Sequence, residues 1–242
     1  MTRIYFPDGI DAGGQCELRG EQAHYLARVL RLQAGASVTL FDGRGGEYPA
    51  SVVSVAKHAV GLAAGPRQEI DRESPLEVRV AQAISSGERM DLTVQKAVEL
   101  GAASIQPLST ERAVVHLDAE RARKRVAHWQ AIAESACAQC GRNVVPQIAP
   151  VMTYAAWLGS LGEDGALRLM LAPAAARRLH ELQRPAGAIW LLCGPEGGLA
   201  ESERLAAEHA GFRAVKLGPR VLRTETAALA ALAAMQALWG DF

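Results

Sequence analysis

The sequence predicts an α/β protein made of a small β-rich domain followed by a domain with a parallel sheet. Two observations predict this fold class. Up to about residue 70, short apolar or alternating runs follow one another with turn residues between them. After Leu76 the pattern changes, and continuous apolar runs alternate with amphipathic helices, which is typical of a parallel sheet covered by helices on both faces.

Composition limits the possible classes of protein. The chain has 242 residues, of which 49% are hydrophobic, and its formal net charge is +0. This hydrophobic content supports a folded core, and contact with nucleic acid has to come from local basic patches. No run has the length of a membrane span or the pattern of a secretory leader. We therefore expect a cytoplasmic protein without membrane contact.

The cysteines indicate neither disulfides nor a metal site. Cys137 and Cys140 form a C-x-x-C pair, but no second pair and no histidine at ligand spacing accompanies them. The pair also falls inside a predicted helix. We interpret both as helix residues that pack in the core, and we expect no bound metal.

The first domain is predicted to span residues 1–70. Strands are expected over 3–6, 37–41, 48–55 and 59–63, and a helix over 20–32. The outer face of that helix carries His24, Arg28 and Arg31, so a small barrel with basic residues is a candidate RNA-docking module. An ordinary solvated helix face explains the same residues. The polar segment 66–75 is interpreted as a linker.

The second domain is predicted to span residues 74–242. The expected strands are 78–84, 104–108, 167–171, 189–193 and 214–217, and the expected helices are 89–100, 118–141, 174–183, 200–209 and 227–239. Asp118 is expected to cap its helix, and Thr224 or Thr226 to cap the last one. The apolar face of that last helix, which includes Leu238, packs either in the core or against a second subunit.

Two loops of the second domain point to a small-molecule site. Gly194–Leu199 and Leu217–Ala227 each follow an apolar strand and are rich in glycine and charge. Ligands of open α/β sheets bind at the carboxyl ends of the strands, and glycine lets the backbone approach a ligand closely. No dinucleotide fingerprint, phosphate-loop lysine or nucleophile elbow is present, which disfavours hydride transfer, ATP hydrolysis and serine hydrolysis.

These loops resemble those of the SPOUT superfamily of S-adenosylmethionine-dependent RNA methyltransferases, and most of all the 16S ribosomal RNA uridine-N3 methyltransferase family. The resemblance spans nearly the whole chain. It includes further similar segments at His24–Arg31, Gly87–Asp91, Gln95–Gly101, Ile105–Pro107, Glu111–Arg112, Trp129 and Glu134–Arg142. One departure is Ser86, because many relatives have a lysine at this position.

The resemblance implies the rest of the architecture. The second domain is expected to contain a deep trefoil knot that holds S-adenosylmethionine, and the first to be a PUA-like RNA-binding β-barrel. The implied active unit is a homodimer that acts on 16S rRNA of the 30S subunit near the decoding centre. The implied cofactor-binding residues are Leu171, Ala172, Gly194, Pro195, Glu196, Gly197, Gly198, Leu217, Gly218, Val221, Leu222, Arg223, Thr224, Thr226 and Ala227.

The implied reaction suggests catalytic residues. N3 of uridine carries a proton, and the anion left by its removal is spread over O2 and O4. A guanidinium can donate hydrogen bonds to these oxygens and stabilise the charge. Arg223 is the first candidate for that role. Glu196 and Glu225 either orient Arg223, accept the proton, or simply pair with Arg220 or Arg223.

RNA contacts are expected from basic residues of both domains, namely Arg3, His24, Arg28, Arg31, Arg89, Arg112 and Arg142. Two alternatives stay open. The chain could be a non-catalytic RNA-binding or ribosome-assembly factor, or it could methylate another RNA position.

Overall fold

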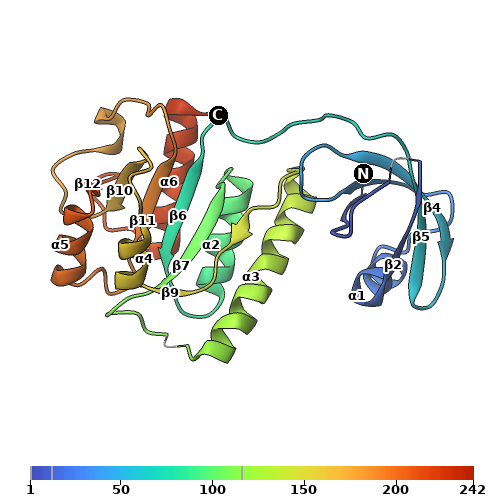
Figure 1. Cartoon of the computed structure of the whole chain (residues 1–242), viewed down its shortest axis with the longest axis horizontal. Coiled ribbons are helices and arrows are strands. Elements are labelled where there is room, and N and C mark those ends of the chain that lie inside the picture. The colour runs from blue at the N-terminus through green and yellow to red at the C-terminus, as the bar shows by residue number, and fades with distance from the viewer. Residues whose placement is uncertain (1, 12, 116) are drawn as a thin grey trace. The chain divides into compact units, whose positions relative to one another are not determined.

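A computed structural model of the chain describes residues 2–11, 13–115 and 117–242, and Figure 1 labels most of its elements. Contacts divide the chain into two compact units. The first unit is Met1–Glu73 with Cys137–Val145, and the second is Ser74–Ala136 with Pro146–Phe242. The division after Glu73 falls inside the segment that the sequence marks as a linker. Cys137–Val145, which the sequence places in the second domain, packs with the first unit.

The first unit is built on a five-stranded sheet with the order β1-β3-β4-β5-β2. β1 and β3 are parallel, and the other neighbours are antiparallel. Its core holds aliphatic side chains from all five strands, because alternate residues of each strand face inward. The strands are β1 (Thr2–Tyr5), β2 (Gln15–Arg19), β3 (Ser37–Phe41), β4 (Tyr48–Val55) and β5 (Ala59–Ala64). Of these, β2 was not predicted.

The predicted helix over 20–32 is shorter and irregular. It consists of α1 (Gly20–His24) and a π-helical turn at Tyr25–Val29, and it buries Ala23 and Leu26 against the core. The helical segment is over by Arg31, whose φ of 52° lies in the left-handed region that helices exclude.

The second unit is built on a sheet of seven strands, all of whose pairings are parallel. The order is β12-β10-β11-β6-β7-β8, and β9 also pairs with β7. The strands are β6 (Val78–Ala83), β7 (Ser104–Ser109), β8 (Gln147–Ile148), β9 (Met152–Thr153), β10 (Leu167–Leu171), β11 (Ile189–Cys193) and β12 (Arg213–Val215). This confirms the predicted α/β class with a parallel sheet. The knot that the resemblance implies stays a prediction.

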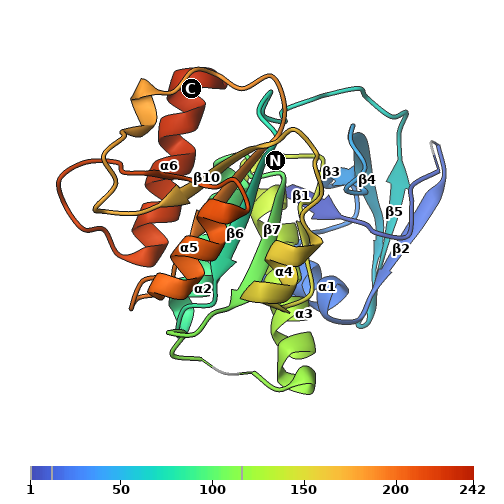
Figure 2. The ribbon, with the colours of Figure 1, turned by 60° about the vertical axis from the view of Figure 1, so that its left-hand side comes forward.

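Helices cover both faces of this sheet. On one face α4 (Tyr154–Ser160) and α5 (Glu201–His209) lie side by side, as Figure 2 shows, over an aromatic cluster centred on Trp157. Adjacent residues of a strand face opposite ways, so Ala81 points to this cluster and Gln82 to the other face. There α2 (Glu88–Glu99) packs against α6 (Thr224–Trp239). The long helix α3 (Ala119–Cys140) begins after Asp118, whose carboxylate accepts a bond from the backbone of Arg121 and caps it as predicted.

Two local predictions were wrong. Residues 174–183 form no α-helix but only a 3-10 turn at Leu179–Glu181. The backbone there bonds instead to Lys216, because the Leu179 N–H donates to its carbonyl and the Arg177 carbonyl accepts from its N–H. The cap of α6 is also different. The N-cap is Arg223, and Thr224 is the first helical residue, whose hydroxyl donates to the carbonyl of Gly194.

The last helix packs mainly inside its own unit. Leu232 and Met235 are fully buried, whereas Leu238 is 46% exposed. None of the helices in the described part of the chain is long and apolar enough to cross a membrane.

Candidate functional site

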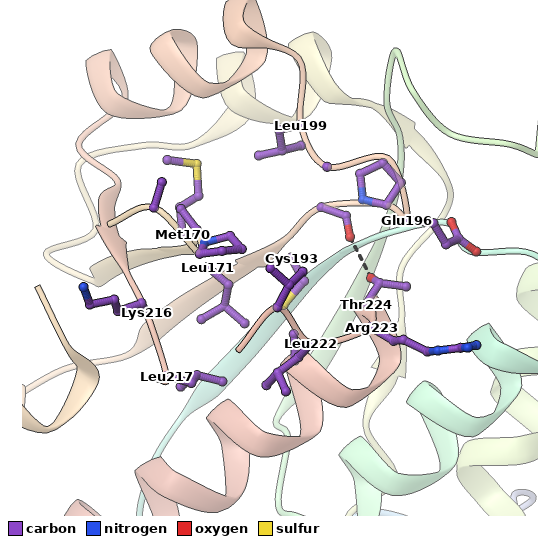
Figure 3. A pocket seen from close by; sticks show the side chains of 18 of the residues that line it. Met170, Leu171, Cys193, Glu196, Leu199, Lys216, Leu217, Leu222, Arg223 and Thr224 are labelled. Carbon is purple, nitrogen blue, oxygen red and sulfur yellow. Dashed lines mark hydrogen bonds between the residues drawn. The ribbon is translucent and has the colours of Figure 1, made fainter. Parts of the chain in front are cut away.

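A cavity of about 780 Å³ opens at the carboxyl ends of β10, β11 and β12. Its walls are the three loops that follow these strands, together with the start of α6, as Figure 3 shows. All of the predicted cofactor-binding residues except Thr226 line it. The parallel register explains why, since it brings the ends of neighbouring strands to one edge.

Several lining residues were not among the predicted cofactor-binding residues. Strand ends contribute Met170, Cys193 and Val215 to the floor of the cavity. The sequence could have indicated them, because each lies in the last part of a predicted strand, at the edge where a ligand is expected. The other additional lining residues are Arg89, Pro173, Ala174, Leu199, Arg204, Lys216 and Arg220.

The loop Gly194–Leu199 turns tightly at the mouth of the cavity. A Cβ at Gly194 would lie 3.1 Å from the backbone nitrogen of Leu199, closer than nine in ten real Cβ contacts. Gly198 has a φ of 67°, and its N–H donates to the carbonyl of Pro195 at 2.9 Å. The backbone of this loop therefore needs glycine at both positions.

Glu196 is held by groups that follow β6. Its Oε1 accepts bonds from the Ser86 N–H (3.1 Å) and hydroxyl (3.2 Å), and it pairs with Arg89 at 3.0 Å. Burial alone would raise the pKa of Glu196, but these bonds and one from its own backbone outweigh it and hold the pKa below its usual value. Of the alternatives left open for Glu196, pairing with Arg220 or Arg223 is not found, because its ion-pair partner is Arg89. Ser86, at the position where the resemblance leads us to expect a lysine, contributes a hydroxyl donor.

Arg223 and Glu225 stand at the start of α6 and have few partners. Arg223 is exposed, and within the described residues its guanidinium has no hydrogen bond or ion pair. One carboxylate oxygen of Glu225, Oε2, is buried without a hydrogen-bond partner there. Both side chains line the same cavity as Glu196. The three predicted catalytic residues are thus brought together, and two of them keep polar atoms for a ligand.

The cavity carries an excess of positive charge. Its lining includes Arg89, Arg204, Lys216, Arg220 and Arg223 against two glutamates. Glu196 neutralises Arg89, and two helical glutamates neutralise Arg204. In the part of the chain that the structure describes, the other three cations have no acidic partner. The unpaired positive charge favours binding of a polyanionic ligand at this site over binding of a neutral or acidic protein.

The predicted RNA-binding residues fall into three groups. In the second unit, Arg89 lines the cavity and the guanidinium of Arg112 donates to the Gly197 carbonyl at 3.4 Å, so both flank the glycine-rich loop. In the first unit, His24, Arg28 and Arg31 are exposed along the helical segment. In the third group, Arg142 is buried and Arg3 is partly buried.

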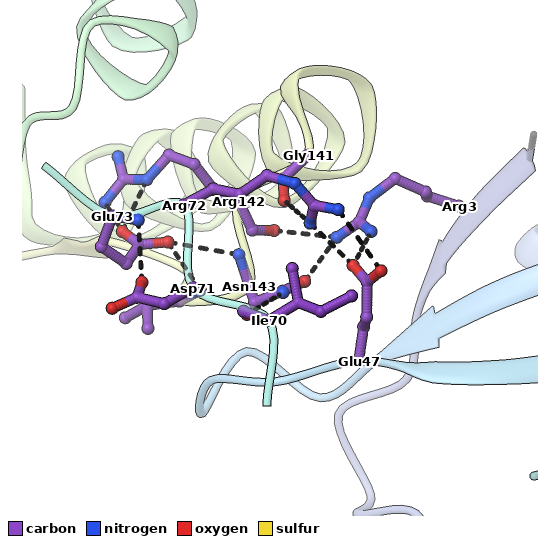
Figure 4. A network of polar contacts seen from close by, with 10 residues as sticks. Arg3, Glu47, Ile70, Asp71, Arg72, Glu73, Gly141, Arg142 and Asn143 are labelled. Atoms are coloured by element: carbon purple, nitrogen blue, oxygen red, sulfur yellow. Dashed lines mark hydrogen bonds and ion pairs between the residues drawn. The ribbon is translucent and has the colours of Figure 1, made fainter. Parts of the chain in front are cut away.

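Arg3 and Arg142 belong to a network of charges inside the first unit, shown in Figure 4. Arg3 pairs with Glu47 and donates to Asn143 Oδ1 at 2.6 Å. Arg142 pairs with Glu73 at 2.6 Å, and its side chain is only 8% exposed. Because carboxylates already neutralise both guanidiniums, this arrangement argues against a phosphate contact by either. It explains instead why Cys137–Val145 packs with the first unit.

The cysteines of the C-x-x-C pair differ in environment. Cys137 is buried, which raises the pKa of its thiol to about 12, and Cys140 is partly exposed. A thiol with so high a pKa is a poor nucleophile and a poor metal ligand. Over the described residues, no group of three or more histidine, cysteine, aspartate or glutamate side chains could hold a metal ion.

Comparison with known proteins finds a matching family model for each unit. The family model described as "RNA methyltransferase domain" matches residues 72–236, and the one described as "RNA methyltransferase PUA domain" matches residues 18–61. Among curated proteins, the "Ribosomal RNA small subunit methyltransferase E" of Buchnera aphidicola is 31% identical over 244 residues, which cover 100% of this chain and 95% of that protein.

Two similar solved structures contain bound S-adenosylmethionine. One is the ribosomal RNA small subunit methyltransferase E of Neisseria gonorrhoeae, with 45% identity, a TM-score of 0.95 and coverage of 100% of this chain and 99% of that chain. The other, a putative methyltransferase of Legionella pneumophila, has 40% identity, a TM-score of 0.94 and the same coverage. The chain therefore belongs to the RNA methyltransferase family that these domains define, which confirms the resemblance of its C-terminal loops to SPOUT enzymes.

Proposed function

We propose that this chain is an S-adenosylmethionine-dependent methyltransferase that modifies N3 of a uridine in 16S rRNA, near the decoding centre of the 30S subunit. One observation carries the proposal. The cavity lies in the three loops at the strand ends, in a chain that matches two cofactor-bound relatives from end to end. The printed name of the relatives supports small-subunit rRNA as the substrate, and the uridine position rests on the motifs of Leu217–Ala227.

The residues around the cavity fit the cofactor. Its volume lies within the range of sites that enclose drug-sized ligands. Leu171, Leu217 and Leu222 offer apolar surface for a nucleoside base, and the glycine-rich loop offers backbone groups at close range. These residues would hold S-adenosylmethionine, which supplies an electrophilic methyl group on sulfur.

The side chains at the mouth of the cavity would prepare the base. N3 lies on the Watson–Crick edge, so the uridine has to be unpaired or flipped out before it can enter. Arg223, whose guanidinium is not engaged elsewhere in the described chain, would donate to the oxygen that carries the charge after N3 loses its proton. Glu225 fits the proton acceptor better than Glu196, because Arg89 and Ser86 already occupy Glu196.

Exposed residues of each unit support an RNA substrate and a second subunit. The PUA unit presents His24, Arg28 and Arg31, which we propose contact RNA phosphates. The homodimer also belongs to this proposal. Val221 is 79% exposed beside the cavity, and Leu238 at the end of α6 is also exposed, so a partner could cover both. A deep knot at the cavity and a cytoplasmic location, where 30S subunits are found, complete the proposal.

Mass mapping of 16S rRNA tests the proposal. We expect 3-methyluridine near the decoding centre in cells that carry this gene and its loss in cells without it. Return of the modification with the parent gene, but not with an Arg223→Ala gene, would link the chemistry to this cavity. An unchanged 3-methyluridine signal in the deletion strain would reject the proposal.

A further inference from the structure

A hydrogen-bonded relay joins the central strand of the second unit to both loops of the cavity. Gln82 lies near the end of β6, is fully buried, and is in register with Cys193, the last residue of β11. Its Nε2 donates to the Thr224 hydroxyl at 2.9 Å, and this hydroxyl donates to the carbonyl of Gly194 at 2.6 Å. Gly194 begins one cavity loop. Thr224 is the first residue of α6 and directly follows residues 217–223 of the other loop.

The direction of the relay is fixed by the groups that form it. A carbonyl oxygen only accepts, so the single hydroxyl proton of Thr224 has to point to Gly194. The hydroxyl oxygen must then accept from Gln82, which places the Nε2 of the amide toward Thr224. Nε2 also donates to the Ala83 carbonyl at 2.9 Å. The other amide atom, Oε1, is left buried without a hydrogen-bond partner among the described residues.

This unpaired oxygen argues against a purely stabilising role. A buried polar atom without a partner destabilises the folded state, whereas an apolar side chain of similar shape would not. Gln82 also does not line the cavity, so it reaches a ligand only through Thr224 and Gly194. We infer that Gln82 is a positioning residue, which acts through Thr224 to fix the two cavity loops relative to each other for binding of the methyl donor. The inference rests on the proposed function.

Gln82→Met tests the inference, with Gln106→Met as the matched control. Gln106 is buried on the neighbouring strand β7 and donates in the same way to the next carbonyl, but its second bond goes to Pro150, away from the cavity. In the unliganded full-length protein, we expect Gln82→Met to speed amide hydrogen exchange in 194–199 and 217–223. Calorimetry should show roughly ten-fold weaker binding of S-adenosylmethionine. The melting temperature should not fall. The control should leave exchange and affinity unchanged.

Thr224→Val and Thr224→Ser provide a second, independent pair. Valine keeps the shape but removes the hydroxyl, so Thr224→Val should reproduce the effects of Gln82→Met. Serine keeps the hydroxyl, so Thr224→Ser should show the loop exchange and the affinity of the parent protein. Unchanged loop exchange or unchanged affinity in Gln82→Met would overturn the inference, as would a loss of affinity that only follows a loss of stability. A parent protein that binds no S-adenosylmethionine would reject the proposed function instead, while the exchange comparison would still decide whether the relay holds the loops.

Discussion

Two glutamates at the cavity have the same charge but different partners. Glu196 is engaged by Arg89 and Ser86, which lowers its pKa, whereas Glu225 keeps one carboxylate oxygen without a donor in the described chain. An anion that is already paired with a guanidinium is a weak base. At the scale of single residues, the structure thus separates two roles that the sequence leaves undecided.

Arg223→Ala should damage turnover far more than donor binding. The guanidinium has no partner in the described residues, so its removal should leave the fold intact. Loss of a donor that stabilises a developing anion lowers kcat by about 100- to 1000-fold. Methylation kinetics with 30S subunits and calorimetric titration with S-adenosylmethionine measure the two effects. Arg213→Ala, an exposed position on β12 outside the cavity lining, is the control. Normal turnover of Arg223→Ala would discard the role.

At the scale of elements, the contact between α2 and α6 depends on one glycine. Gly101 ends α2 with a φ of 82°, and a Cβ there would lie 2.7 Å from Nε2 of Gln236, which is 1% exposed on α6. Gly101→Ala should therefore lower the free energy of unfolding by about 1–3 kcal/mol. Urea unfolding followed by circular dichroism measures this. Gly159→Ala, in α4 with nothing within 4 Å of the added carbon, should be neutral or stabilising. Equal stability of the two variants would contradict the reasoning.

The charge network of the first unit makes its stability depend on pH. Bonds from Arg72, with further contributions from Arg3, lower the pKa of Glu47 from 4.5 to about 2 against the effect of burial. A depressed carboxyl pKa stabilises the fold above the unfolded value, and this stabilisation is lost as the pH falls from 4.5 toward 2. Glutamine does not titrate, so the stability of Glu47→Gln should not show this loss between pH 4.5 and 2.

At neutral pH, Glu47→Gln should lower the free energy of unfolding by up to about 3.5 kcal/mol, because the pKa falls from 4.5 to about 2 and one pKa unit corresponds to about 1.4 kcal/mol. Chemical unfolding of Glu47→Gln and the parent between pH 2 and 7 measures it. Glu69→Gln is the control, because the Glu69 side chain is 74% exposed in its pair with Arg67. A parent and a Glu47→Gln variant with parallel pH profiles would show that the network does not set the acid sensitivity.

At the scale of the whole molecule, a chain with a formal net charge of +0 must bind RNA through local patches. Each phosphate contact that is lost reduces the slope of log affinity against log salt by roughly 0.7 to 0.9. Arg28→Ala should therefore weaken RNA binding and reduce the magnitude of this slope by the amount that corresponds to about one phosphate contact. Arg19→Ala, exposed on β2 but paired with Glu17, should change neither. Filter binding over a salt series measures both, and an unchanged slope in Arg28→Ala would remove this surface from the account.

Much of the fold could be predicted because buried parallel strands and amphipathic helices leave periodic patterns in the sequence. The strand ends, and hence the cavity, follow from those patterns. The segment 174–183 could not be predicted, because its backbone bonds to Lys216, a partner that only the folded chain provides. The burial of Arg142 could not be predicted for the same reason, since a surface charge and a buried partner of Glu73 look alike in sequence. The relay from Gln82 likewise joins residues 142 positions apart.

The central claim is that the cavity between the loops after β10, β11 and β12 binds S-adenosylmethionine. Amide hydrogen exchange of the full-length protein with and without S-adenosylmethionine tests it most directly, because the measurement reports both binding and its place. The account predicts slower exchange in 172–175, 194–199 and 217–227 when the cofactor is added. Unchanged exchange throughout the chain, or protection confined to other segments, would contradict it.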